Sequence, residues 1–167
     1  MKPLKRDPLY LRNVIFGIED SLVSTVGLLA GIASEAIPYK TILLTGSVYI
    51  VVEAFSMAVG SFLSEESAEE YVSGAEALGG RAAAGAIVMF LSFVIAGFIP
   101  IVPYLFLSGS AGLYGSIVLS LIALFILGIA NGRISKIKPI RRAIRMVVMG
   151  GCAIIVGVLV GYFVKGA

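Results

Sequence analysis

The stretch VIFGIEDSLVSTVGLLAGIA, residues 14–33, decides the fold of this chain. Its length is about that of an α-helix crossing the hydrocarbon core of a bilayer, roughly 20 residues. Two adjacent acids, Glu19 and Asp20, interrupt the apolar run. An aspartate at the centre of a membrane helix costs about 2.5–3.5 kcal/mol on insertion scales, so an acid there is by default an ion or proton site.

Four further apolar runs of similar length follow, at residues 41–63, 82–102, 113–131 and 144–164. Hydrophobic residues make up 59% of the 167 residues and charged residues only 14%, which is low for a soluble domain. Five spans cannot close a β-barrel, and backbone groups in lipid must pair within their own segment. The sequence therefore predicts an all-α integral membrane protein whose residues 1–167 form one five-helix domain.

The basic residues predict the orientation of the spans. Nearly all of them precede the first span or lie between spans two and three or between spans four and five; Lys40 and Lys165 are the exceptions. The clustered ones are Lys2, Lys5, Arg6 and Arg12, then Arg81, then Arg133, Lys136, Lys138, Arg141, Arg142 and Arg145. Because basic loops stay in the cytoplasm, we expect a cytoplasmic N-terminus and an extracytoplasmic C-terminus. The net charge of +3 reflects this topology and does not indicate nucleic-acid binding.

The composition excludes several classes of chemistry. The chain has no histidine, which excludes histidine-ligated haem, histidine-ligated zinc and Ser-His-Asp hydrolysis. It has no phosphate-binding loop ending in Gly-Lys-Ser/Thr, so the chain alone is not expected to drive pumping with ATP. Its one cysteine, Cys152, is expected to be a small residue of the last span. We expect neither an enzyme nor a permanently bound cofactor.

A third membrane acid, Glu53, lies near the middle of the second span. Helical spacing puts Tyr49, Glu53, Met57 and Ser61 on one face, with Ser56 on its flank. Carboxylate oxygen suits hard divalent ions, and thioether sulfur adds affinity for softer transition metals. Met57 is equally readable as a flexible core filler, and a buried acid is also compatible with a protonated, purely structural role.

The expected depths of these side chains agree with a shared site. With a rise of 1.5 Å per residue, Asp20 lies about 10 Å from the cytoplasmic end of its span, Met57 about 9 Å and Glu53 about 15 Å. Glu19 points about 100° away from Asp20 and is expected to pair with a cytoplasmic arginine or lysine instead. The small residues Gly27 and Gly31 favour either a tight internal helix crossing or a dimer seam.

Two stretches resemble the vacuolar iron transporter family. Residues 12–31, RNVIFGIEDSLVSTVGLLAG, resemble its first helix, in which an Arg, a Gly, an Asp and Gly-Leu-x-x-Gly fall at this spacing. Residues 54–64, AFSMAVGSFLS, resemble its second-helix motif Ala-x-Ser-Met-x-x-Gly-Glu-Tyr-x-Ser. Leu127-Gly128, residues 141–145 and residues 149–161 resemble its last two helices more weakly.

The resemblance implies a five-helix homodimer that moves Fe²⁺, and often Mn²⁺, out of the cytosol in exchange for protons. It implies transport roles for Asp20, Ser56 and Met57. The family's glutamate after the motif glycine is Ser61 in this chain, so we expect Glu53, about two turns earlier, to take over that acidic role. The membrane would be the plasma membrane in a prokaryote and a vacuole-like organelle in a eukaryote.

The connection of residues 64–81 is short and acidic where family members with a full regulatory region carry a large metal-binding domain. It contains Glu65, Glu66, Glu69 and Glu70 at one-turn spacings. These acids are readable as a solvated helix extension or as a surface that collects metal ions at the cytoplasmic mouth.

Two other functions remain open at this point. A proton-coupled exporter of small organic cations also uses a membrane glutamate, but it usually has an aromatic cage, and this chain has no tryptophan. A non-transporting membrane subunit would tolerate the replacement of Asp20 by asparagine.

Overall fold

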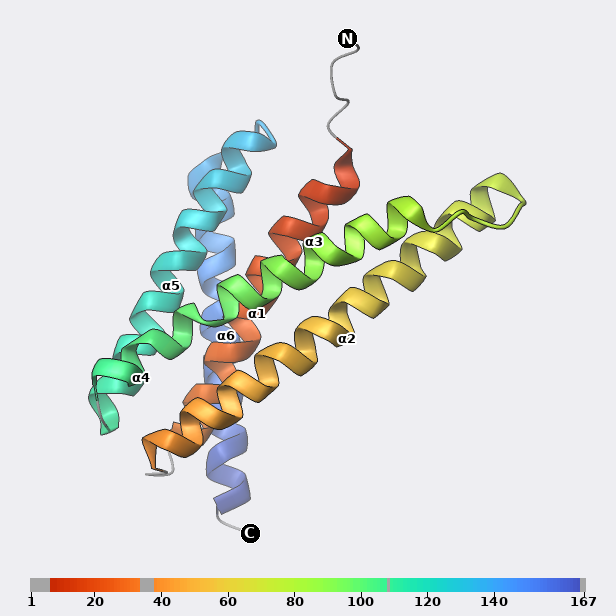
Figure 1. Cartoon of the computed structure of the whole chain (residues 1–167). Coiled ribbons are helices and arrows are strands. Elements are labelled where there is room, and N and C mark those ends of the chain that lie inside the picture. The colour runs from red at the N-terminus through yellow and green to blue at the C-terminus, as the bar shows by residue number, and fades with distance from the viewer. Residues whose placement is uncertain (1–6, 34–37, 108, 166–167) are drawn as a thin grey trace.

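The computed structural model describes residues 7–33, 38–107 and 109–165 (Figure 1). Within these residues the fold is all-helical, without any strand. The elements are α1 (Pro8–Ala33), α2 (Tyr39–Ser73), α3 (Gly80–Gly97), the 3₁₀ turn η1 (Ile99–Ile101), α4 (Val102–Phe106), α5 (Gly109–Ile134) and α6 (Pro139–Lys165). Five helical segments are long and apolar enough to cross a membrane, with α3, η1 and α4 forming one of them. The predicted all-α architecture with five spans is confirmed.

Several helices run beyond the predicted spans. Helix α1 begins at Pro8 instead of residue 14, and α2 continues to Ser73 instead of ending at residue 63. Hydropathy detects only the lipid-facing stretch, whereas glutamate and alanine continue a helix readily in water. The acidic segment is therefore mostly helix, and α2 ends at Gly74, whose left-handed φ of 68° suits a C-cap.

The third span, predicted at residues 82–102, is interrupted in the structure and extends to Phe106. Helix α3 ends at Gly97, and the chain continues through η1 and α4. Pro100 and Pro103 lack the amide hydrogen that a continuing α-helix would use, which accounts for the break. The hydroxyl of Ser116 on α5 donates to the carbonyl oxygen of Pro100 at 2.7 Å and fixes the broken segment.

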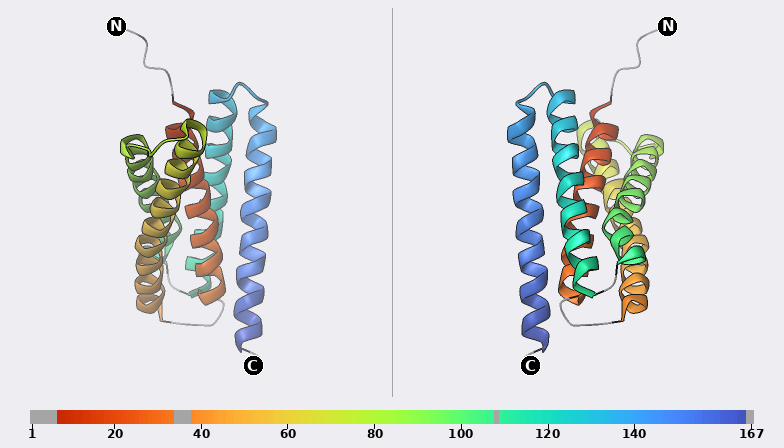
Figure 2. Two further views of the ribbon diagram at one scale, coloured as in Figure 1. Left: turned by 90° about the vertical axis from the view of Figure 1, so that its right-hand side faces the viewer. Right: turned by 90° about the vertical axis from the view of Figure 1, so that its left-hand side faces the viewer.

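Helix α1 lies in the middle of the bundle. Figure 2 shows α2 and α3 on one side of it and α5 and α6 on the other. Half of the apolar window of α1 is buried inside the chain, against 6% for α6, so α1 is the central helix and α6 is peripheral. The core side chains around α1 include Leu22, Leu29, Phe93 and Leu124.

Helices α1 and α6 cross at glycines. A Cβ added to Gly157 would lie 2.0 Å from the carbonyl oxygen of Gly27, and one added to Gly31 would lie 2.7 Å from that of Gly157. Of the two uses expected for Gly27 and Gly31, the structure shows the tight internal crossing. The sequence did not reveal that the partner helix is α6.

Candidate functional site

The predicted stripe on α2 faces α1. Its members Tyr49, Glu53, Met57 and Ser61 are all half-buried, whereas the flanking Ser56 is exposed. Tyr49 lies near Ser24 of α1, and Ser61 Oγ accepts a hydrogen bond from the Asn13 amide of α1 at 3.0 Å. The face of α2 that helical periodicity predicted is therefore half-buried in the bundle.

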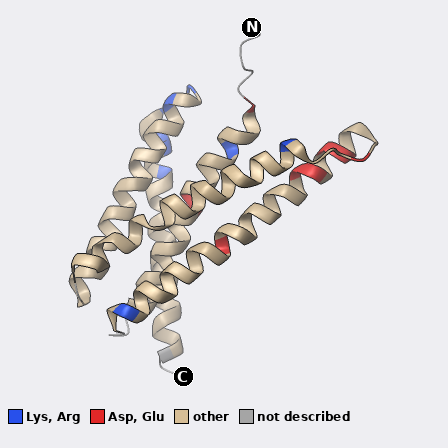
Figure 3. Ribbon diagram, in the orientation of Figure 1, with Lys and Arg blue, Asp and Glu red and all other residues tan. Residues whose placement is uncertain are grey.

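Asp20 of α1 and Glu53 of α2 come together across this interface. Their carboxylates are close enough to repel each other electrostatically. Ser24, one turn beyond Asp20, donates its hydroxyl to the Asp20 carbonyl oxygen at 2.6 Å. Figure 3 shows acidic positions in the otherwise uncharged middle of α1 and α2. In the described part of the chain neither carboxylate has a hydrogen-bond donor or an ion-pair partner.

A cavity of about 860 Å³ opens beside this pair at the end of the bundle where α1 begins. Met57 and Ser56 line it, as does Glu19. Asp20 and Glu53 are not among its lining residues: Asp20 follows Glu19 in α1, and Glu53 lies one turn beyond Met57 in α2. The four predicted site residues therefore fall into two groups. The sulfur of Met57 and the hydroxyl of Ser56 line the cavity, and the carboxylates of Asp20 and Glu53 lie next to it.

Glu19 shares the cavity wall with a basic residue, Arg142 of α6, whose charge acts on the Glu19 carboxylate. The two form no ion pair in the described part of the chain, so the expected pairing of Glu19 stays a prediction. When the Asn131 amide is oriented with its oxygen toward Arg142, that oxygen accepts from the guanidinium at 3.1 and 3.2 Å. Glu19 therefore lies within the electrostatic influence of both Arg142 across the cavity and the neighbouring Asp20 carboxylate.

Asn13 is a site residue that the sequence reasoning missed. Its side chain is 1% exposed, and its Nδ2 donates to Ser61 Oγ of α2 and to the carbonyl oxygen of Gly85 of α3 at 2.8 Å. The Asn13 Oδ1 atom is buried without a partner, and the residue lines the cavity. Its position seven residues before Asp20, two turns away on the same helix face, was the available signal.

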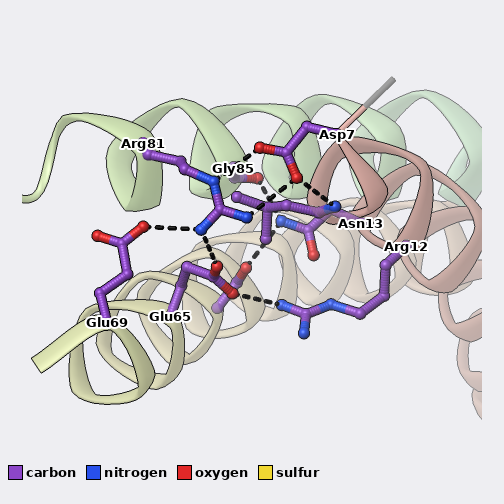
Figure 4. Close-up of polar contacts among 9 residues, drawn as sticks. Asp7, Arg12, Asn13, Glu65, Glu69, Arg81 and Gly85 are labelled. Atoms are coloured by element: carbon purple, nitrogen blue, oxygen red, sulfur yellow. Dashed lines mark hydrogen bonds and ion pairs between the residues drawn. The ribbon is translucent and has the colours of Figure 1, made fainter. Parts of the chain in front are cut away.

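An ion-pair cluster ties together the ends of α1, α2 and α3 (Figure 4). Arg81 at the start of α3 pairs with Asp7 at 2.7 Å, with Glu69 at 2.7 Å and with Glu65. Arg12 pairs with Glu65 at 3.2 Å. The guanidinium of Arg81 and the backbone amide of Leu9 lower the pKa of Asp7 to about 2.

Two of the four acids proposed for metal capture are thus already paired with arginines. Glu66 and Glu70 form no ion pair with the described part of the chain. Among the described residues, no three acidic or cysteine side chains gather closely enough to hold a metal ion. One copy of the chain offers a cation two membrane carboxylates, a thioether and hydroxyls.

Several known proteins are similar to this chain in sequence. The model of the VIT family matches residues 11–78 and 69–162. Vacuolar iron transporter 1 of Arabidopsis thaliana is 35% identical over 74 residues, which are 44% of this chain and 30% of that protein. Vacuolar iron transporter homolog 4 of the same plant is 28% identical over 155 residues, covering 86% of this chain and 78% of the relative.

A third relative, vacuolar iron transporter 1 of Eucalyptus grandis, is 31% identical over 74 residues, again 44% of this chain and 30% of the relative. The matches to the two proteins named vacuolar iron transporter 1 thus span less than a third of their length. The family model, by contrast, matches most of the chain, including both helices of the candidate site. This chain belongs to the VIT family.

Proposed function

We propose that this protein exports Fe²⁺ from the cytosol in exchange for protons. The observation that carries the proposal is the pair of Asp20 and Glu53, whose carboxylates interact electrostatically within membrane-length helices and lack a cationic partner in the described residues. Two carboxylates in an apolar surrounding repel each other unless a proton or a cation lies between them. A site of this kind binds protons and divalent cations in competition.

The donor set favours a transition metal. Asp20 and Glu53 supply hard oxygen, while Met57 supplies a polarisable sulfur one turn from Glu53, with Ser56 beside it on the cavity wall. Such a mixture suits Fe²⁺ and admits Mn²⁺, whereas Mg²⁺ gains nothing from sulfur. Ser61 is hydrogen-bonded to Asn13, which supports the assignment of the acidic role to Glu53.

The position of the cavity supports export from the cytosol. It opens at the bundle end that holds the start of α1, the Arg81 cluster and the α5–α6 turn, which the distribution of basic residues assigns to the cytoplasm. Fe²⁺ enters from that side, passes Met57 and Ser56, and binds the ionised carboxylates. Protons arriving from the opposite side neutralise Asp20 and Glu53 and weaken their hold on the metal.

A second copy of the chain would complete the coordination. Two carboxylates and a thioether are fewer ligands than a divalent ion normally takes. Below the first cavity, an apolar groove of about 680 Å³ runs between α1 and α6 and is lined by small residues such as Gly27, Gly31 and Gly161. We propose a parallel homodimer with α1 near the two-fold axis, which native mass spectrometry tests; a monomer that stays active after reconstitution contradicts it.

Uptake into proteoliposomes tests the transport proposal. The protein is reconstituted, a pH gradient is imposed, and Fe²⁺, Mn²⁺, Mg²⁺ and a panel of organic cations are offered in turn. We expect proton-gradient-driven movement of Fe²⁺ and, more slowly, Mn²⁺, and its loss in Glu53→Gln. Movement of organic cations without Fe²⁺, or unchanged Fe²⁺ movement in Glu53→Gln, would refute the proposal.

A further inference from the structure

A second polar cavity lies at the turn between α5 and α6, away from the Asp20–Glu53 pair. Its volume is about 560 Å³, and it is lined by Lys136, Ile137, Lys138, Arg141, Arg142 and Arg145. Five of these six residues are basic, and no acid lines the cavity. Figure 3 shows the corresponding basic positions on the neighbouring ends of α5 and α6. The cavity therefore has the charge of an anion site.

The backbone around this cavity is held rigidly. A Cβ added to Gly132 would lie 2.5 Å from the Cα of Pro139, and one added to Gly128 would lie 2.3 Å from the Cα of Ala143. The two helices therefore approach with backbone against backbone on both sides of the turn. The amide of Ile137 donates to the Gly132 carbonyl oxygen at 3.0 Å and closes the end of α5. The basic side chains thus project from a fixed frame.

Lys136 occupies a backbone position where glycine is the usual residue. Its φ of 56° is left-handed, and Lys136 alone among the described non-glycine residues has a positive φ. Helices commonly end with a left-handed residue, usually glycine because a side chain is strained there. A lysine at this position supplies a charge at the cavity wall that glycine would not supply.

Most of these charges have no counter-ion within the described residues. The ion pairs of that part of the chain go to Arg12 and Arg81, at the ends of α1, α2 and α3. Arg142 acts electrostatically on Glu19 and also lines the first cavity. Four basic side chains remain around the space, namely Lys136, Lys138, Arg141 and Arg145. Their mutual repulsion falls when an anion lies among them.

The surroundings of the cavity indicate where that anion comes from. The cavity lies at the end of two membrane-length helices, and exposed isoleucines at 134, 137, 140 and 144 adjoin it. Basic clusters directly next to membrane spans attract anionic lipid headgroups. We propose that this basic cavity binds the phosphate of an anionic phospholipid headgroup, with the acyl chains lying along the exposed isoleucines. The site is independent of the transport proposal.

The experiment is a lipid titration followed by native mass spectrometry of the full chain in detergent. The probes are phosphatidylglycerol, phosphatidylcholine and inorganic phosphate. The test variant is Lys138→Gln/Arg141→Gln/Arg145→Gln, which leaves Arg142 in place. The matched control is Lys2→Gln/Lys5→Gln/Arg6→Gln, which removes the same number of charges from the segment before α1. A swap that keeps charge, Lys138→Arg/Arg141→Lys/Arg145→Lys, completes the set.

We expect the wild type, the control and the swap to bind phosphatidylglycerol about tenfold or more tightly than phosphatidylcholine. The test variant should lose that preference. Equal loss in the test variant and the control would overturn the proposal, since net charge alone would then explain binding. Displacement of the lipid by millimolar inorganic phosphate would also overturn it, because the site would then take a free anion. If the triple variant does not fold, Arg141→Gln and Arg145→Gln, both at exposed positions, must each weaken binding.

Discussion

Asp20 and Glu53 differ from the acids at the helix ends in what surrounds them. Glu65 contacts two arginines, and Asp7 and Glu69 share Arg81. The membrane pair has no such partner among the described residues and lies in apolar helices. An unpaired charge in a low-dielectric surrounding is costly, whereas an exposed ion pair contributes little. Asp20 and Glu53 are therefore the carboxylates that a bound cation would stabilise most.

Met57 tests the contribution of sulfur to metal choice. Met57→Leu keeps the volume and apolarity of the side chain but removes the thioether at the cavity wall. We expect the preference for Fe²⁺ over Mg²⁺ or Ca²⁺ to fall, because sulfur favours softer metals. Competition between metals in the proteoliposome assay measures this preference. Unchanged selectivity would show that Met57 only fills space.

Asp7 gives a pH-dependent signal at the cluster outside the membrane. Its pKa of about 2 lies below the value of about 3.9 expected in an unfolded chain. The Asp7–Arg81 pair therefore stabilises the fold fully above pH 3.9, and this contribution is lost as the pH falls through 2. The pKa of Asp7 can be measured by carboxyl ¹³C NMR of a sample labelled at aspartate. The spectrum contains only two side-chain carboxyl signals, because the chain has two aspartates.

The assignment of those two signals follows from Asp20→Asn, which removes the one that does not belong to Asp7. We expect Arg81→Gln to raise the Asp7 midpoint back toward about 3.9, since the main cause of the low pKa is the Arg81 hydrogen bond. A midpoint that stays near 2 in Arg81→Gln would show that the Arg81 contact is not formed in solution.

At the scale of elements, the crossing of α1 and α6 positions the part of α6 that lines the first cavity with Arg142. Gly157 permits this crossing because a side chain there would collide with the backbone of Gly27, which cannot move aside as a flexible side chain could. Small residues at such contacts let membrane helices pack by close van der Waals contact. The geometry of the first cavity therefore depends on glycines far from its lining.

Gly157→Ala tests the crossing. The added methyl group would lie 2.0 Å from the Gly27 carbonyl oxygen, so the helices must separate. Overpacking of this kind costs about 1–3 kcal/mol, and we expect a lower Tm in detergent. The control is Gly151→Ala on the same helix, where nothing lies within 4 Å of the new Cβ. Equal Tm values for the two variants would contradict the crossing.

The water-exposed end of α2 is proposed to raise the capture rate of metal ions. Replacing Glu65, Glu66, Glu69 and Glu70 together by glutamine should raise the apparent KM for Fe²⁺ at low salt and change the maximal rate much less. The KM effect should shrink as salt rises, because exposed charges are screened. Complete loss of transport at saturating Fe²⁺ in a folded protein would show that the cluster is an obligatory site.

Glu66→Gln/Glu70→Gln separates capture from structure. This double variant leaves the contacts of Glu65 and Glu69 with Arg81 intact. If capture is electrostatic, the double variant should produce part of the KM effect without a change in Tm. A lower Tm in the quadruple variant alone would then show that the ion pairs of Glu65 and Glu69 with Arg81 stabilise the fold.

At the scale of the whole molecule, composition and hydropathy were enough to predict five membrane-length helices. Helical periodicity put Tyr49, Glu53, Met57 and Ser61 on one face of α2, and all four are half-buried there. Helix ends were less predictable: α1 and α2 extend past the lipid-facing stretch, and Pro100 breaks the third span. Hydropathy does not register either effect.

Residues that depend on contacts between helices were beyond the sequence reasoning. Asn13 donates to Ser61 and to the Gly85 carbonyl oxygen, which come from two other helices, and its spacing from Asp20 along α1 could not predict those two partners. The sequence indicated only that Arg81 marks the cytoplasmic side. In the structure Arg81 is the centre of an ion-pair cluster, because its partners Asp7, Glu65 and Glu69 come from other parts of the chain. The interface of α6 with α1 was likewise unpredictable from one glycine motif.

The most direct test of the central claim is Fe²⁺ transport by Asp20→Asn in proteoliposomes. Asparagine keeps the size of the side chain but holds no negative charge and releases no proton, so the site loses half of its carboxylates. We expect a folded protein whose proton-driven Fe²⁺ transport is abolished. Wild-type transport rates in folded Asp20→Asn would contradict the account.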